Sequence, residues 1–348
     1  MGAAPVAGAS PVVSRRRFNS REVAVAAGVS QATVSNVLNR PHLVAPATLE
    51  RVMKTIDSLD FMINRSAQTL RAGQGSTLGI LVLDVANAFW GDVTRGVQDA
   101  AAEMGRLVIV CSSGESELKE EQFLLLLESH QVSDILVAPV ASGSSVMKRI
   151  QSRGTRLIFL DSVSEEGQFD AVAVDDVKGA ELAAEHLLSL GHRCVAFVNG
   201  PRSISWCQNR AVGFMDTYHS AGGEVHELSV PTMTARSALS CVDELLDLVP
   251  RVSAAFCAND MLALGVLQGL TRRGINVPDD LSLVGYDDDD FAEVLSPPLT
   301  TIRQDPYEIG RRAGQMAMAG SEGGDAATPT VVMLEPLLIA RDSVRRLG

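Results

Sequence analysis

The chain has 348 residues, enough for two or three compact units at roughly 100–200 residues per domain. Its formal net charge of −12 argues against a nucleic-acid contact spread over the whole surface. No apolar run reaches the roughly 18 residues that a membrane span needs. The five cysteines, an odd number without a C-x-x-C pair, favour free thiols in a reducing compartment over a disulfide framework.

The first 14 residues are rich in Gly, Ala, Pro and Ser, and three arginines follow them. This stretch lacks the charged start and apolar core of a secretory signal. We therefore expect residues 1–17 to form a disordered extension. We also expect a cytoplasmic protein without a membrane partner.

Residues 18–62 have the pattern of a helix-turn-helix unit. Asn19 or Ser20 can cap a first helix, and Glu22 stands in the capping-box position relative to Asn19. Three apolar residues are expected on its inner face: Val23, Ala26 and Ala27. Gly28 then supplies the tight turn, which needs a residue that tolerates positive φ.

Ser30 can cap a second helix, whose inner face carries apolar residues at helical spacing: Val34, Val37 and Leu38. The opposite face presents small or hydrogen-bonding side chains near the helix N-terminus: Gln31, Ala32, Thr33, Ser35 and Asn36. Such a face is what a recognition helix in a DNA major groove requires. An ordinary helical hairpin is the alternative, because the short motif A-x-x-x-G-V-S alone does not separate the two.

A third helix is expected to begin at Pro46, a residue that suits the first helical position. Apolar residues repeat at helical spacing after it: Leu49, Val52, Ile56 and Leu59. Residues 63–75 follow and include NRSAQTLRAG, which has a basic polar face, the apolar Leu70 and a Gly stop. We interpret 63–75 as a hinge helix and linker, since the helix is too short to be stable alone.

The charge is distributed unevenly along the chain. Residues 15–75 hold nine Lys and Arg against four Asp and Glu, a local charge of +5, and the rest carries −17. A basic N-terminal block on an acidic body places a polyanion contact at that end of the chain.

From residue 76 to 348 short apolar strands alternate with helices, the pattern of a parallel, doubly wound α/β sheet. One series runs from LGILVLDV to AVAVD, and a similar series runs from VDDVKGAELAAEHLLSLGH to LSLVGYD. Two such series predict two subdomains with a cleft between them. We expect the first to comprise about 76–174 and 304–329, and the second about 175–303 and 330–348.

Ligands of such sheets bind at the carboxyl ends of the strands. This sequence places acidic and amide side chains there: Asp84, Asn87, Asp161, Asp175, Asn199, Asn259, Asp260 and Asp287. A strand-end Asp is more often a helix cap than a ligand, and for Asp260 the cap is the favoured interpretation.

The run EVAVAAGVSQATVSNVLN, followed by NRSAQTLRAG, resembles the lactose-repressor (LacI/GalR) family, and the resemblance extends along the chain after residue 18. It implies a helix-turn-helix headpiece whose second helix reads the major groove, with base-reading positions at Gln31, Ala32 and Asn36. Phosphate contacts would come from Thr33, Ser35 and Arg65, with Ser30 and Asn39 on the same surface. Leu70 would wedge between two base pairs in the minor groove.

The headpiece departs from that family at three positions. Asn36 stands where Arg or His is common, and its amide would favour adenine where Arg favours guanine. Ala45 replaces the usual cap Ser before the third helix, and Ile63 stands where a Pro often precedes the hinge.

The same resemblance continues through AND (258–260), VGYDD (284–288) and PPLTTIRQD (297–305), and implies a type I periplasmic-binding-protein-like core. Three residues would hold a small effector: Asp287, Arg210 and Asn259. Five more would line the cleft: Phe89, Trp90, Asp161, Trp206 and Gln304. A carboxylate facing a guanidinium suits vicinal hydroxyls, and an aromatic face suits the apolar side of a sugar ring.

The resemblance therefore implies a sequence-specific DNA-binding regulator, most often a repressor that a small effector, usually a sugar, releases from a palindromic operator. A regulator that depends on a corepressor, either a purine or a phosphoprotein partner, is one alternative. A sugar-binding protein without DNA function is another. No catalytic set, metal-ligand spacing or cofactor motif stands in the sequence, so we expect no enzyme activity, metal or cofactor. Because no leucine heptad follows LLIARDSVRRLG, we expect a homodimer.

Overall fold

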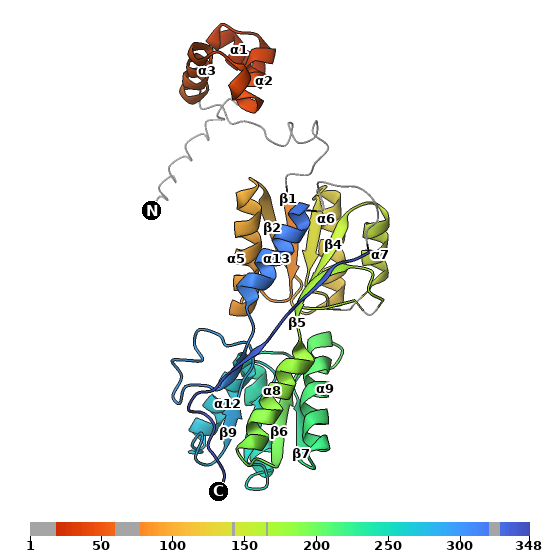
Figure 1. The fold of residues 1–348 in the computed structure, drawn as a ribbon, viewed down its shortest axis with the longest axis vertical. Coiled ribbons are helices and arrows are strands. Elements are labelled where there is room, and N and C mark those ends of the chain that lie inside the picture. The colour runs from red at the N-terminus through yellow and green to blue at the C-terminus, as the bar shows by residue number, and fades with distance from the viewer. Residues whose placement is uncertain (1–18, 60–76, 141–142, 165, 320–327) are drawn as a thin grey trace, which may run out of the picture. The chain divides into compact units, whose positions relative to one another are not determined.

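The computed structural model describes residues 19–59, 77–140, 143–164, 166–319 and 328–348. The chain divides into two compact units at Ala72 and Gly73 (Figure 1). The expected extension and hinge, with Arg65 and Leu70, lie outside the described residues. None of the described helices is both long and apolar enough to cross a membrane.

The first unit is a three-helix bundle with a short 3-10 turn. Its elements are α1 (Ser20–Ala27), α2 (Gln31–Asn39), η1 (Pro41–Leu43) and α3 (Pro46–Ser58). The side chains that these helices bury together are small and apolar: Val23, Ala24, Ala27, Val34, Val37, Val52 and Ile56. The expectation of a buried Ala26 is wrong, because α1 turns Ala24 inward and leaves Ala26 exposed.

The second unit begins with a six-stranded, wholly parallel sheet in the order β11-β5-β4-β3-β1-β2. Its strands are β1 (Thr77–Val82), β2 (Leu107–Ser112), β3 (Asp134–Val137), β4 (Arg156–Leu160), β5 (Asp170–Val174) and β11 (Val331–Leu334). The helices of this first subdomain are α5 (Ala88–Glu103), α6 (Glu117–Ser129), α7 (Ser145–Ser152) and α13 (Pro306–Ala319).

Alternating side chains of the first sheet build two separate cores. On β4, Ile158 and Leu160 pack toward α5 and α13, whereas Leu157 and Phe159 pack toward α6 and α7. This alternation follows from the two-residue period of a strand, because successive side chains point to opposite faces. A strand buried on both faces reads as a continuous apolar run, which is why these strands stand out in the sequence.

The second subdomain is built on a four-stranded parallel sheet in the order β7-β6-β8-β9. Its strands are β6 (Cys194–Asn199), β7 (Glu224–Ser229), β8 (Ala254–Cys257) and β9 (Ser282–Val284). Its helices are α8 (Asp176–Ser189), α9 (Ser205–Ser220), α10 (Ala235–Leu239), α11 (Val242–Asp247) and α12 (Asp260–Arg272).

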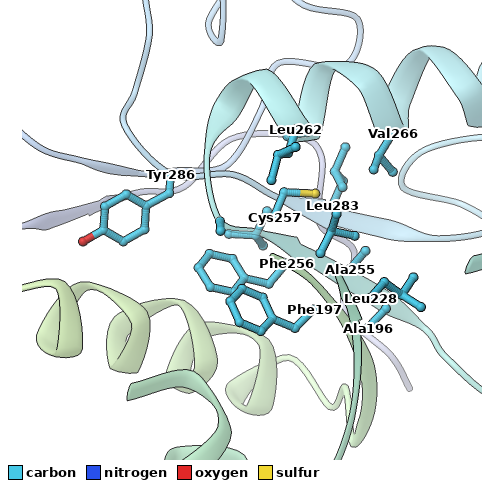
Figure 2. Packing of buried hydrophobic residues seen from close by; sticks show 14 of the residues in the cluster. Ala196, Phe197, Leu228, Ala255, Phe256, Cys257, Leu262, Val266, Leu283 and Tyr286 are labelled. Atoms are coloured by element: carbon cyan, nitrogen blue, oxygen red, sulfur yellow. The ribbon is translucent and has the colours of Figure 1, made fainter. Parts of the chain in front are cut away.

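Aromatic rings form the centre of this second core. Phe197 stacks on Phe256 with ring centroids 5.1 Å apart, and Phe214 stacks on Phe256 at 4.6 Å. Tyr286 lies beside them, and its hydroxyl points away from the two labelled phenylalanine rings (Figure 2). The ring of Tyr286 therefore belongs to the buried core, while its hydroxyl is directed toward Asp176.

The chain crosses between the two subdomains more than once. It leaves the first sheet after β5, and it returns through α13 after β10 (Thr301–Arg303), which pairs antiparallel with β12 (Leu337–Ile339). The expectation that residues 331–334 belong to the second subdomain is wrong, because β11 pairs in parallel with β5. The apolar run VVML predicts a strand but does not indicate which sheet it joins.

Helices α5 and α13 pack against each other through glycine and lie side by side in Figure 1. A Cβ at Gly96 would lie 2.2 Å from the Tyr307 carbonyl oxygen and 2.7 Å from the Arg311 amide nitrogen. Both are backbone atoms of α13, so no side-chain rotation relieves the contact. The close approach of the two backbones therefore requires glycine at this position.

We predict that Gly96→Ala lowers the free energy of unfolding by about 1–3 kcal/mol, the usual effect of overpacking. Gly91 is the matched control, because it is exposed on the same helix and a Cβ there would meet nothing within 4 Å. Gly91→Ala should leave stability unchanged or raise it by about 0.5–1 kcal/mol. Urea unfolding monitored by circular dichroism measures both changes, and equal effects would contradict this packing.

Candidate functional site

The turn between α1 and α2 is fixed by side-chain caps. The Asn19 side chain accepts from the backbone amides of Arg21 and Glu22, each at 3.0 Å, and Glu22 accepts from the Asn19 amide at 2.9 Å. This is the expected capping box, and it is confirmed with Asn19 as the cap. Gly28 takes φ +65° and ends α1, as a turn of this kind requires.

Helix α2 begins in the same way. Ser30 Oγ accepts from the Thr33 amide at 3.0 Å and lies 2.8 Å from Thr33 Oγ1. Gln31 Nε2 donates to Ser20 Oγ at 2.9 Å, so α1 holds the Gln31 side chain. These bonds fix how the first turn of α2 projects from the unit.

The structure places the described DNA-contact candidates on the outer surface of α2 and its cap. Most of them are exposed: Ser30, Gln31, Ala32, Ser35 and Asn36. Thr33 is half-buried, and the side chain of Asn39 is not among the described groups. Their contacts with DNA remain a prediction.

The eight predicted effector residues surround one cavity of about 190 Å³ in the second unit. They are Phe89, Trp90, Asp161, Trp206, Arg210, Asn259, Asp287 and Gln304. Eight further residues complete the lining: Leu83, Asp84, Ala86, Asn87, Glu115, Met233, Thr234 and Met261. Both subdomains contribute, through the carboxyl ends of their strands and the helices that follow, as parallel sheets dictate.

Arg210 is buried on α9 with its guanidinium already engaged. Nε donates to Asp176 Oδ1 at 2.8 Å, Nη1 donates to the Ala258 carbonyl at 2.5 Å, and Asp287 Oδ1 lies 3.6 Å from Nη1. The guanidinium carbon lies 3.6 Å from the centroid of the Tyr286 ring and 4.7 Å from that of Trp206. Burial alone would lower the pKa of Arg210, but Asp176 and the other nearby acids hold it above its usual value.

Asp176 and Tyr286 hold the cavity-lining Arg210 in place, and the sequence pattern did not single out either of them. Among the acids after β5, the sequence favours Asp175, which in the structure caps α8 by accepting from the Lys178 amide. The adjacent Asp176 turns inward instead, where Arg210 and the Tyr286 hydroxyl donate to it. The doubled acid of VDDVKG was the only signal for this, and it does not indicate which acid is buried.

The cap of α12 is Asn259, and the expectation that Asp260 caps this helix is wrong. Asn259 Oδ1 caps α12 by accepting from the Leu262 amide at 2.8 Å, while its Nδ2 donates to the Met233 carbonyl. Asp260, favoured as the cap, is buried and accepts from Thr301 Oγ1 at 2.7 Å and from the Asp289 amide at 2.9 Å. Asn259 therefore shapes the cavity wall with its polar atoms already used.

Three cavity-lining side chains carry buried polar atoms without a hydrogen-bond partner among the described residues: Asp161 Oδ1, Trp206 Nε1 and Gln304 Oε1. Buried polar groups in folded proteins are normally paired, and an unpaired one costs about 1–3 kcal/mol. Asp161 is also held at φ +51°, a conformation disfavoured for a side chain larger than glycine. The cavity therefore offers one donor and two acceptors to a bound molecule.

The cavity lining is acidic. Burial raises the pKa of Asp161, with Asp176 adding to the rise and Arg210 opposing it. Burial likewise raises the pKa of Asp287 to about 8, against the opposing effect of Arg210. Gln304 Nε2 donates to Asp287 Oδ1 at 2.6 Å, and Asp287 has φ +114°.

Asp287 should make the protein less stable as pH rises from about 4 to about 8. Its pKa is raised on folding from 3.8 to about 8, so the folded state binds the extra proton. This contribution to stability is complete below the unfolded pKa and is lost as pH rises through the folded pKa.

We predict that Asp287→Asn flattens the fall in melting temperature between about pH 4 and pH 8, the interval between those two pKa values. Asp279→Asn, at an exposed position, is the control and should follow the parent curve. Differential scanning calorimetry across this range measures both. A pH profile of Asp287→Asn that matches the parent would contradict the raised pKa.

The comparisons with known proteins agree with this geometry. Residues 21–64 match the model of bacterial regulatory proteins of the lacI family, and residues 184–344 match a periplasmic binding protein-like domain. The chain is 30% identical over 332 residues to the HTH-type transcriptional repressor PurR of Vibrio campbellii, covering 94% of this chain and 99% of that protein.

Two solved structures are similar over most of their length. The lac repressor dimer bound to operator and the anti-inducer ONPF has a TM-score of 0.84 at 26% identity, covering 95% of this chain and 100% of that one. A LacI family transcriptional regulator from Enterococcus faecium with bound ribose has a TM-score of 0.71 at 28% identity, covering 78% of this chain and 100% of that one.

A helix-turn-helix unit followed by a two-subdomain α/β core defines a DNA-binding transcriptional regulator, and the predicted fold class is confirmed. The chain belongs to the lacI family of bacterial regulatory proteins.

Proposed function

We propose that this regulator is a cytoplasmic repressor that binds a palindromic operator as a homodimer and leaves it when a small, neutral, polyhydroxylated effector, a sugar, enters the cavity. The observation that carries the effector part is the set of three buried polar atoms, around a cavity of about 190 Å³, that have no hydrogen-bond partner in the described part of the chain. Hydroxyl groups can both donate and accept, so a sugar satisfies Asp161, Gln304 and Trp206 together.

The charges around the cavity favour a neutral ligand over an anionic one. Arg210 is the one cation among the lining residues, and Asp176, Asp287 and a backbone carbonyl already occupy it. A phosphate or carboxylate would have to sit among acidic side chains without a free positive partner. This argues against a phosphorylated ligand as the effector.

The size and walls of the cavity favour a monosaccharide. Its volume lies below the roughly 300–1,000 Å³ of pockets for drug-sized ligands. Phe89 and Trp90 contribute aromatic walls, with their rings 5.0 Å apart and perpendicular. Aromatic faces pack well against the apolar side of a sugar ring. The regulator from Enterococcus faecium, similar in fold, holds ribose.

A catalytic role finds no support in the cavity. Its lining residues include no Ser, Cys, His or Lys, and the hydroxyl of the lining residue Thr234 caps α10 by accepting from the Ser237 amide. The relatives are transcriptional regulators as well. We therefore propose that the protein is not an enzyme.

Asp161→Asn tests the effector proposal with little risk to the fold. One of its carboxylate oxygens has no partner, and Asn tolerates the positive φ of this residue. We predict unchanged operator affinity but a roughly 2–10-fold higher sugar concentration for release, since burial raises the pKa of Asp161 and a hydrogen bond between neutral groups contributes about 0.5–1.5 kcal/mol.

The measurement is an operator titration by fluorescence anisotropy, with the effector first chosen from monosaccharides, disaccharides, sugar phosphates and purines by thermal shift. Asp290→Asn, exposed and outside the cavity lining, is the control. Release of Asp161→Asn at the parental concentration would place the effector elsewhere. A purine or phosphate hit that tightens operator binding would favour the corepressor alternative.

An exposed apolar surface supports the homodimer. Strand β2 is an edge of the first sheet, and α6 packs against its neighbour β1. Several large apolar side chains on these two elements are exposed: Leu107, Ile109, Val110, Leu118, Leu125 and Leu126. A soluble monomer rarely exposes a cluster of this kind, which is typical of a subunit interface.

We predict that Ile109→Asp and Leu126→Asp each weaken dimerisation by more than about tenfold, because burying an isolated carboxylate costs well over about 1.4 kcal/mol. Met333→Asp is the matched control, since Met333 is also half-exposed but lies on β11, the opposite edge of the sheet. Sedimentation velocity measures the assembly state. Dimers that persist in both interface variants would contradict this surface.

A further inference from the structure

Three side chains of different chemistry converge at the edge of the second sheet. Cys194 begins β6, and Glu224, its register partner, begins the edge strand β7. His226 follows two residues later, on the same face of β7 as Glu224. The parallel register between two strands therefore fixes the positions of all three.

The distances between their polar atoms are those of ligands around one metal ion. Cys194 Sγ lies 3.8 Å from Glu224 Oε2, His226 Nε2 lies 3.1 Å from Glu224 Oε1, and the ligand atoms of all three lie within 4.8 Å of one another. Metal–ligand bonds of about 2.0–2.3 Å in a tetrahedron separate neighbouring ligand atoms by roughly 3.3–3.8 Å. Small rotations of the side chains reach that arrangement.

The histidine nitrogen is the unexplained atom of the group. His226 Nε2 is buried, yet it makes no hydrogen bond with any described residue, and its approach to Glu224 is an ion pair only if the ring is protonated. When the ring is neutral and its proton is on Nδ1, Nε2 carries a lone pair that it can donate to a metal ion.

We propose that Cys194, Glu224 and His226 bind Zn²⁺, with a solvent molecule in the fourth position. Thiolate, imidazole and carboxylate are the ligands that Zn²⁺ takes in proteins, and the mixture of soft and hard donors suits it better than Mg²⁺ or Ca²⁺. Binding replaces the thiol proton, which passes to the solvent. The expectation from sequence that no metal binds rested on ligand spacing, and these ligands lie on two strands 30 residues apart.

Arg251 pairs with Glu224 in this structure and would compete with a metal ion for that carboxylate. Its guanidinium donates to Glu224 Oε1 at 2.5 Å, and its side chain is 65% exposed. Because it is exposed, the side chain can swing into solvent when Zn²⁺ neutralises the carboxylate. Removing this cation should therefore strengthen metal binding, which would not follow if the three side chains were only a structural hydrogen-bonding group.

The site is separate from the effector cavity. The cavity lies at the carboxyl end of the strands, whereas Cys194 stands at the amino end of β6, five residues before Asn199. At about 3.3 Å per residue, this is a separation of roughly 17 Å along the strand. Metal binding here does not depend on the identity of the effector.

The test is calorimetric titration of the reduced, chelator-free, full-length protein with zinc chloride, together with cobalt chloride absorption as a reporter of thiolate ligation. We expect one ion per chain, a cobalt–thiolate band, and about tenfold or greater loss of affinity in Cys194→Ser and His226→Asn. Arg251→Ala should bind Zn²⁺ several-fold more tightly than the parent.

His219→Asn is the matched control, because this histidine is exposed on the neighbouring helix α9 and should leave affinity unchanged. Melting temperatures without metal show whether each variant folds. Unaltered zinc affinity in folded Cys194→Ser, equal losses in His219→Asn and His226→Asn, or weaker binding in Arg251→Ala would each overturn the site.

Discussion

The buried guanidinium of Arg210 is the interaction on which the cleft depends. It ties α9 to α8 through Asp176, reaches the end of β8 through the Ala258 carbonyl, and stacks on Tyr286. A cation removed from water is tolerated only when charged and polar groups surround it, so the acids around Arg210 are required by the fold itself. Because these contacts already engage Nε and Nη1, we infer that other side chains contribute much of the recognition of a ligand.

Those side chains are supplied by both subdomains. Asp161 extends from the end of β4 in the first sheet, whereas Trp206 lies on α9 in the second subdomain. Each carries a buried polar atom that lacks a partner among the described residues. A ligand that satisfies both favours one arrangement of the subdomains over others. Such a difference in affinity between arrangements is what any ligand-driven switch requires.

Much of this architecture could be predicted from the sequence, because the local preferences for helix caps, turns and buried strands agree with the fold. Asn19, Gly28 and Ser30 act as the caps and turn that their types indicate, and the apolar strands of the first sheet are buried on both faces. All eight effector candidates border one cavity because parallel strands bring their carboxyl ends to a common edge.

The remaining features depend on contacts between distant segments. The sequence does not show that Asp176, and not Asp175, faces Arg210, because both follow the same strand. Nor does it reveal β7, whose polar residues (EVHELS) reflect its place at the sheet edge and obscure its strand character. The partner of β11 and the neighbours of Cys194 are likewise set by sheet order, which no local pattern encodes.

The central claim is that a sugar in the cavity and the operator favour opposite states of one dimer. Thermodynamic linkage then requires reciprocity: the factor by which saturating sugar weakens operator affinity must equal the factor by which saturating operator weakens sugar affinity. Anisotropy titrations of labelled operator, and calorimetric titrations of sugar with and without operator, measure the two factors on the same protein. Equal factors well above one are predicted. Sugar that binds with the same affinity to free and operator-bound protein would contradict the claim.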